Sequence, residues 1–160
     1  MPFRATLDTK SREFQYKLLN RCLVTNALLL KVGRLASTLA CAFCGDMDES
    51  LEHLITSCHY SKDIWAEVIK WFHKQGIKIV NLSDKDIMLG IVGCNDELFV
   101  NHVLLVAKQY LYYCRKKSSL PSIRVLDSKI KMIYKFETII AKSNNKMSAH
   151  NIKWGKYKVQ

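Results

Sequence analysis

The stretch of sequence that decides the fold lies at residues 41–58 and reads CAFCGDMDESLEHLITSC. It spaces three cysteines and one histidine as C-x2-C-x8-H-x4-C, so the candidate ligands are Cys41, Cys44, His53 and Cys58. Structural zinc sites use four thiolate or imidazole ligands in a tetrahedron. The C-x2-C turn, followed by the flexible Gly45, directs two sulfurs to one point. His53 and Cys58 are close to one helical turn apart and can converge there. The stretch therefore predicts a zinc knuckle.

Two other interpretations of this stretch stay open at the level of sequence. One is a catalytic Cys–His pair, although a nucleophilic cysteine rarely lies among two further cysteines. The other concerns the imidazole ligand, because His59 directly follows Cys58 and can replace His53. Four protein ligands close the coordination sphere of a metal. We therefore expect a structural site and not a catalytic one.

The composition is that of a folded chain. Of its 160 residues, 49% are apolar and 24% are charged, with only 6 Gly and 2 Pro. These values exclude disorder throughout and favour long helices over many short strands. No apolar run reaches the ~18 residues of a transmembrane helix, and the first residues lack the apolar core of a secretory signal. We expect a soluble intracellular protein, of nucleus or cytoplasm, without membrane partners. Reduced cysteines are then the rule, and Cys22, Cys94 and Cys114 are predicted to be buried core residues.

Apolar residues recur at helical spacing through most of the remaining chain. The longest stripe predicts a central helix over residues 97–117. Ser61 is expected to cap a helix over 62–74, and residues 77–81 are expected to be extended. Further helices are predicted over 11–24, 27–32, 84–89 and 121–143, and residues 83–86 resemble a capping box that begins the helix over 84–89. The sequence thus predicts an all-α fold: a helical domain over 1–145 with the knuckle 41–58 inserted, and a loosely ordered basic tail over 146–160.

Positive charge is concentrated in the C-terminal part of the chain. Residues 111–160 hold twelve Lys or Arg and two Asp or Glu, nearly the whole net charge of +11. A basic block of this kind suits a polyanion, most often nucleic acid. The acidic residues of the knuckle would repel phosphate, so we expect the binding surface C-terminal to it. The candidate nucleic-acid contacts are Arg115, Lys116, Lys117, Arg124, Lys131, Lys135, Lys142, Lys153, Lys156 and the stacking candidate Trp154, with Tyr112, Tyr113 and Tyr157 as further aromatics among the charges.

The knuckle and its flanks resemble the reverse-transcriptase zinc-binding domain at the C-terminal end of LINE-type, non-LTR retrotransposon proteins. The resemblance lies in Cys41-x2-Cys44, the run ESLEHL at residues 49–54, Cys58 and Trp65. Upstream, FQYKLL at 14–19 is similar to the helix before the knuckle. Downstream, LGI at 89–91, the run from Asn101 to Tyr112, and Lys153-Trp154 are similar to the family's later segments. Ala42 stands where the family often has proline, which leaves the ligands untouched.

The resemblance implies a C-terminal fragment of a retrotransposon protein whose catalytic domains lie upstream. It implies zinc as the cofactor and RNA, or another nucleic acid, as the partner, with the polymerase domains of a parent protein as a further one. We find no paired carboxylates of the polymerase or nuclease kind, so we expect no enzymatic activity and no small-molecule substrate. The alternative is a protein-interaction module that docks on the parent reverse transcriptase or on a host factor.

Overall fold

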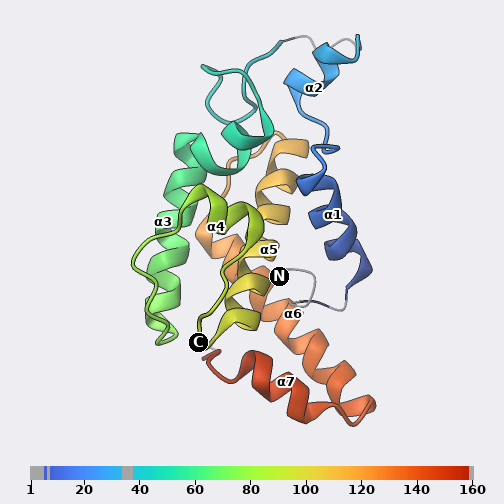
Figure 1. Ribbon diagram of the computed structural model, residues 1–160, viewed down its shortest axis with the longest axis vertical. Coiled ribbons are helices and arrows are strands. Elements are labelled where there is room, and N and C mark those ends of the chain that lie inside the picture. The colour runs from blue at the N-terminus through green and yellow to red at the C-terminus, as the bar shows by residue number, and fades with distance from the viewer. Residues whose placement is uncertain (1–5, 7, 34–37, 159–160) are drawn as a thin grey trace.

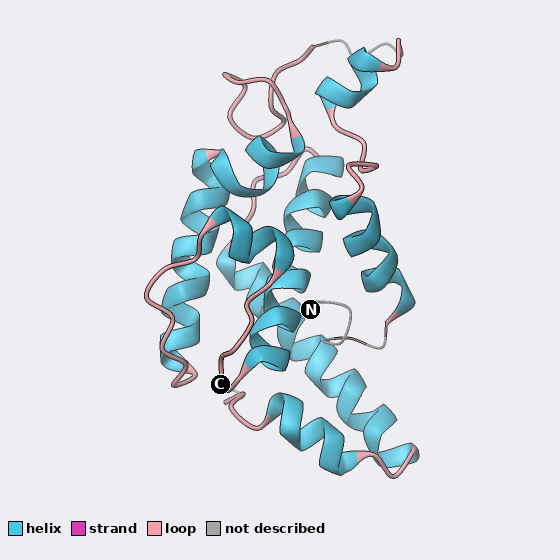
Figure 2. Ribbon diagram, in the orientation of Figure 1, coloured by secondary structure: helices cyan, strands magenta, loops and turns pink. Residues whose placement is uncertain are grey.

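A computed structural model of the chain describes residue 6 and residues 8–33 and 38–158. This part is mostly helical (Figure 2), and its only β-pairing is an isolated bridge between Ala40 and Asp48. The all-α prediction is confirmed. The helices are α1 (Thr9–Leu19), α2 (Asn26–Lys31), the π-helix η2 (His53–Ser57), α3 (His59–Lys74), α4 (Asp84–Leu89), α5 (Glu97–Lys116), α6 (Ile123–Ser143) and α7 (Met147–Trp154).

Helix α5 forms the centre of the molecule (Figure 1). It packs against α1, α6, α7 and η2, and most of its side chains are buried. An apolar surface all round is what a helix enclosed by neighbours requires. The knuckle (residues 41–58) and α2 lie at one end of the molecule, while α7 lies at the other end (Figure 1). The knuckle and the basic C-terminal segment are thereby joined through one long helix.

Several predicted helix boundaries agree with the structure. Ser83 accepts a hydrogen bond from the Asp86 N–H and the Asp86 side chain accepts one from the Ser83 N–H, which is the predicted capping box of α4. Thr25 caps α2 through its side chain. Helix α1 ends at Leu19, earlier than predicted, because the chain turns at Arg21 with a positive φ of 56°.

Other expectations were wrong. Helix α3 begins at His59 with Cys58 as its N-cap residue, and the Ser61 hydroxyl instead donates to the Leu54 carbonyl at 2.6 Å. Residues 77–81 lie outside the helices, as expected, but they pair with no other strand. Of the three cysteines expected in the core, Cys114 is buried, Cys94 is half-buried and Cys22 is exposed.

The last segment is also more ordered than the sequence led us to expect. Residues 147–154 form α7, and Trp154 and Tyr157 are buried against Phe99 and Tyr134. Aromatic burial, and not helical amphipathicity, therefore folds this basic segment onto the domain. Among the described residues, no helix is both long and apolar enough to cross a membrane.

Candidate metal centre and basic surface

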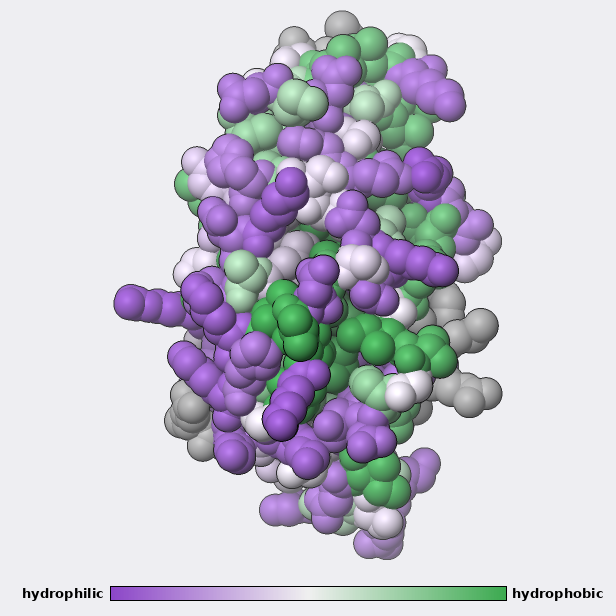
Figure 3. Space-filling view, turned by 60° about the vertical axis from the view of Figure 1, so that its left-hand side comes forward, coloured by the Kyte–Doolittle hydropathy of each residue, from purple (hydrophilic) through white to green (hydrophobic). Residues whose placement is uncertain are grey.

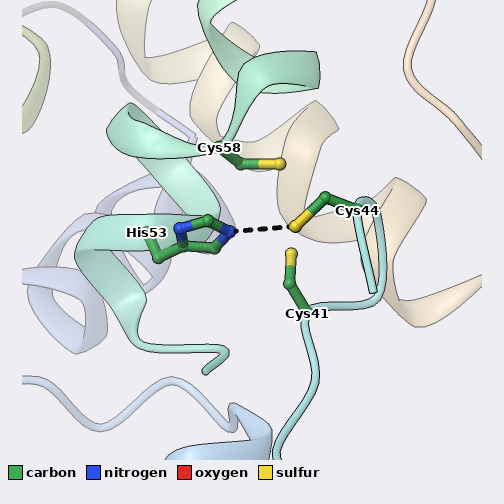
Figure 4. Close-up of side chains that lie close together, drawn as sticks. All are labelled: Cys41, Cys44, His53 and Cys58. Carbon is green, nitrogen blue, oxygen red and sulfur yellow. Dashed lines mark hydrogen bonds between the residues drawn. The ribbon is translucent and has the colours of Figure 1, made fainter. Parts of the chain in front are cut away.

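The four predicted ligands lie together. One ligand atom from each of Cys41, Cys44, His53 and Cys58 falls within 4.8 Å of every other. The two cysteines of the C-x2-C turn face His53 and Cys58 across the cluster (Figure 4). The Cys44 Sγ lies 3.3 Å from the His53 Nε2. His59 is exposed, and its ring instead lies tilted against Tyr60 with the ring centres 4.1 Å apart, which leaves His53 as the imidazole of the cluster.

A short, tightly bonded loop positions Cys41 and Cys44. The Cys41 N–H donates to the Met47 carbonyl at 2.8 Å, and the Gly45 N–H donates to the Cys41 carbonyl at 2.9 Å. Gly45 has a φ of 75°, a conformation that costs a residue with a Cβ about 1 kcal/mol or more. The loop therefore closes on itself and points both sulfurs to one side.

A π-helical turn brings His53 and Cys58 together. The Cys58 N–H donates to the His53 carbonyl at 2.7 Å, which is the i to i+5 bond of η2. The Ser50 hydroxyl accepts from the His53 N–H at 3.0 Å and begins this segment. Trp65 of α3 donates its indole N–H to the Ile55 carbonyl at 2.7 Å and so anchors the turn. The five-residue spacing of the two ligands thus matches a π turn.

Burial and local hydrogen bonds give the thiols of the cluster different acidities. Burial raises the pKa of Cys41 to about 12 and also raises the pKa of Cys58. Burial acts in the same direction on Cys44, but the Asp46 N–H and the hydrogen bond with His53 outweigh it and lower the pKa of Cys44 to about 6. Backbone N–H groups also favour each of the other two thiolates.

The donor set fits zinc. Three thiols and one imidazole form the Cys3His combination of closed structural zinc sites, whereas calcium and magnesium require oxygen ligands. The N–H groups that face the sulfurs would stabilise the negative charge that three thiolates bring. Cys41, Cys44, His53 and Cys58 would hold the ion, which would cross-link the loop, η2 and the start of α3.

A buried ion pair ties this centre to the rest of the domain. Glu49 is fully buried, and its carboxylate accepts from the backbone N–H groups of Ala42 and Asn26, both at 2.9 Å. The Arg115 guanidinium of α5 lies 2.8 Å from the same carboxylate and also donates to the Asn26 side chain. The knuckle, α2 and α5 therefore meet at a single carboxylate.

Three of the ten predicted nucleic-acid contacts are held by partners within the fold. Arg115 is committed to Glu49, and its side chain is 13% exposed. Lys153 bonds both oxygens of Glu137 at 2.9 Å, and burial lowers the pKa of Lys153 despite the attraction of that carboxylate. Trp154 is only 3% exposed, so its ring has no free face for a base. Contacts within the fold, which no local sequence pattern reveals, therefore hold all three side chains.

The remaining candidates lie at the surface. Lys131 is half-buried and pairs with Asp127 at 3.1 Å. The other six are exposed and have no ion pair within the described residues. They lie at the end of α5, along α6 and after α7: Lys116, Lys117, Arg124, Lys135, Lys142 and Lys156.

The sequence interpretation missed two lysines that the fold adds to this surface. Lys10 of α1 and Lys129 of α6 both line a groove beside Lys116. Lys129 occupies a different face of α6 from Lys131, since two residues correspond to about 200° of helix. Lys10 is distant in sequence, so only the packing of α1 against α5 reveals it.

Comparison with known proteins places the metal centre in a family context. Residues 2–65 match the model of a family described as zinc-binding in reverse transcriptase. The matched range contains the whole Cys3His cluster and ends at Trp65, the residue that anchors the π turn. Comparisons with curated proteins and with solved structures gave no match. The part of the chain that carries the metal centre is thus similar to the zinc-binding segment of reverse transcriptases.

Proposed function

We propose that the chain is a zinc-stabilised module that binds nucleic acid, with RNA as its target, and that it derives from the C-terminal part of a LINE-type retrotransposon protein. In this role it would hold template RNA for polymerase domains located elsewhere in a parent protein. The module would act by binding and carry out no catalysis of its own. The family match and the Cys3His cluster support the zinc-binding part of the proposal.

One observation carries the nucleic-acid part. Exposed cations without a carboxylate partner in the described residues gather at the end of α5 and on α6, among them Lys116, Lys117 and Arg124. Cations held in ion pairs stabilise the fold, whereas cations left free are available to neutralise phosphates. The metal centre would fix the geometry of one end of α5 and need not contact the ligand.

Binding of the zinc-loaded chain to single-stranded RNA and to duplex DNA, at about 50 and about 200 mM salt, tests the proposal. We expect affinity to fall steeply with salt. The triple variant Lys116→Gln, Lys117→Gln, Arg124→Gln should bind more weakly and reduce the slope of log K against log salt by about 2. The matched control removes three exposed cations around α3, through Lys62→Gln, Lys74→Gln and Lys78→Gln, and should retain the slope. Absence of binding at low salt by the folded, zinc-containing chain would contradict the proposal.

A second candidate function, docking onto a protein partner, is favoured by a different observation. Apolar side chains gather in the middle of the face shown in Figure 3. The segment from residue 77 to residue 98 contains Val80, 93% exposed, and Val92, 79% exposed, beside acidic residues such as Asp84. A complex that resists salt and that Val80→Asp abolishes would support this function, because apolar contacts lack the salt dependence of phosphate contacts.

A further inference from the structure

A groove of about 500 Å³ lies between α1, α5 and α6, outside the metal centre. Its lining includes the aromatic side chains of Phe14, Tyr110 and Tyr113 and the cations of Lys10, Lys116 and Lys129. Among the described residues, no acidic side chain lines it. The volume falls within the range of small-ligand sites, and the combination of flat aromatic rings with cations is unlike an ordinary apolar crevice.

The lysines lie over the aromatic faces. The Lys129 Nζ lies 5.1 Å from the centre of the Tyr113 ring and 6.0 Å from that of Tyr110. Lys117 lies over Tyr113 at 6.0 Å, and Lys116 lies over Tyr112 at 5.4 Å. Tyr113 is 49% exposed, so its ring is the accessible aromatic surface of the groove.

The other tyrosines of the groove are buried and hydrogen-bonded within the fold. Tyr112 is 8% exposed and its hydroxyl bonds the Val24 backbone, while the Tyr110 hydroxyl accepts from the Ser122 N–H at 2.8 Å. These contacts hold the walls of the groove rigid. They leave Tyr113 as the single aromatic among the lining residues whose ring is largely free.

The energies favour replacement of the lysines by a base. Stacking of a nucleic-acid base on an aromatic side chain contributes more free energy than a cation over an exposed ring. An ammonium group displaced from Tyr113 stays within reach of the phosphates that flank the stacked base. The same lysines can therefore contact the aromatic rings in the free chain and bind the phosphates in the complex.

We propose that this groove binds an unpaired segment of single-stranded nucleic acid, with one base stacked on Tyr113 and the adjacent phosphates held by Lys10, Lys116 and Lys129. The inference rests on the proposed function and adds its site and its strand preference. Bases within a duplex are already stacked on one another and cannot reach Tyr113. An acidic peptide would satisfy the lysines but leave the exposed ring unused.

Fluorescence anisotropy with the zinc-loaded chain tests this site. The probes are labelled oligouridylate of about 12 nucleotides and an RNA duplex of about 12 base pairs, lengths within the site sizes of single-strand binders. Tyr113→Leu should weaken binding of oligouridylate about 5- to 100-fold and leave duplex binding unchanged. Tyr113→Phe should retain affinity for both. Tyr16→Leu is the matched control, because Tyr16 is 60% exposed on α1 and does not line the groove.

A second pair of variants tests the site independently of Tyr113. Lys129→Gln should weaken oligouridylate binding more than Lys131→Gln, because Lys131 faces Asp127 outside the groove. Equal effects of Tyr113→Leu and Tyr16→Leu on a chain that binds oligouridylate would overturn the site but leave the proposed function standing. Equal loss of duplex binding in Tyr113→Leu would overturn the strand preference. Failure of the unsubstituted chain to bind either probe would overturn the proposed function itself. Tyr113-dependent binding of an oligoglutamate peptide, without binding of RNA, would assign the groove to an acidic protein segment instead.

Discussion

Glu49 shows how one side chain joins the metal centre to the helical core. Its carboxylate is fully buried and accepts from Ala42 in the knuckle, from Asn26 at the start of α2, and from Arg115 on α5. A buried carboxylate is tolerated only when its oxygens are paired in this way. From the sequence alone, the acidic residues of the knuckle suggest repulsion of phosphate. At position 49 the acidic side chain instead holds the knuckle, α2 and α5 together.

Removal of one partner from this pair should strongly destabilise the fold. Arg115→Met leaves a buried, uncompensated carboxylate, and we expect it to lower the free energy of unfolding by about 3–5 kcal/mol. Arg21→Met is the matched control, because Arg21 pairs with Glu52 at the surface, with side chains 74% and 43% exposed. Exposed pairs contribute about 0–1 kcal/mol. Urea denaturation of both variants with zinc present measures the difference, and equal losses would contradict the central role of Glu49.

Lys108 is a second residue whose burial has a measurable consequence. It is 1% exposed on α5, and its Nζ donates to the Gln15 side chain at 2.8 Å and to the Met88 carbonyl at 3.1 Å. Burial lowers the pKa of Lys108 to about 7. Below that pH the folded chain carries a buried charge, whereas the unfolded chain keeps its proton up to about pH 10.

Stability should therefore rise with pH through the interval from about 7 to about 10, where the unfolded chain binds more protons than the folded chain. The increment reaches about 1 kcal/mol per pH unit. Lys108→Met lacks this titration, so the variant should be relatively more stable at about pH 6 and lose that advantage by about pH 9. The unfolding free energies of the two proteins, measured at both pH values with zinc present, check this. A difference that does not change with pH would show that Lys108 stays charged in the fold.

At the scale of elements, α7 depends on its tertiary contacts. The helix has only 8 residues, and isolated helices of this length are unstable in water. Trp154 compensates for this, since its ring lies 5.4 Å from Phe99 and 5.3 Å from Tyr134 and its indole N–H donates to Glu137 at 2.6 Å. The segment therefore folds because the aromatic core at this end of the molecule accepts it.

Truncation of that ring should separate a core role from a nucleic-acid role. We expect Trp154→Ala to lower the free energy of unfolding by about 3–5 kcal/mol. Ile152→Ala, on the same helix but 74% exposed, should change it by less than about 0.5 kcal/mol. Thermal unfolding compares the two. A Trp154→Ala protein that kept its stability but lost affinity for RNA would restore the stacking role that its burial argues against.

The elements that could be predicted are those with a local signal. The apolar stripe along α5 and the capping box of α4 can each be recognised within one short stretch of sequence, and both appear where they were expected. The start of α3 could not be placed, because Ser61 bonds to Leu54 in the preceding π-helix instead of capping its own helix. Helix α7 lacked a stripe altogether, so only the aromatic core could reveal it.

The residues of the candidate site also differ in whether a local sequence signal predicts them. Cys41, Cys44 and Cys58 follow from spacing, since a short loop and one turn bring them together, whereas the choice of His53 over His59 needed the structure. The pair of Glu49 with Arg115 spans 66 positions, and the groove around Tyr113 draws on three helices. No short stretch of the sequence contains either arrangement. Arg115 was therefore expected at the surface, and Lys129 was not expected in the site.

At the scale of the whole molecule, α5 connects two different surfaces. One end carries the metal centre and its ion pair with Glu49, and the flank of the same helix lines the basic, aromatic groove. The metal would stabilise the end of the molecule at which η2 packs against α5. In this account zinc maintains the shape of the module, and the groove and free lysines bind the ligand.

X-ray absorption at the zinc edge of the purified, zinc-loaded chain tests the central claim most directly. The account predicts one zinc ion per chain, with three sulfur ligands at about 2.3 Å and one nitrogen ligand at about 2.0–2.1 Å. Cys58→Ser should change the sulfur shell and lower the melting temperature, because binding of a structural metal is coupled to folding. A chain that folds with no bound zinc, or a zinc ion with oxygen ligands in place of the three sulfurs, would contradict the account.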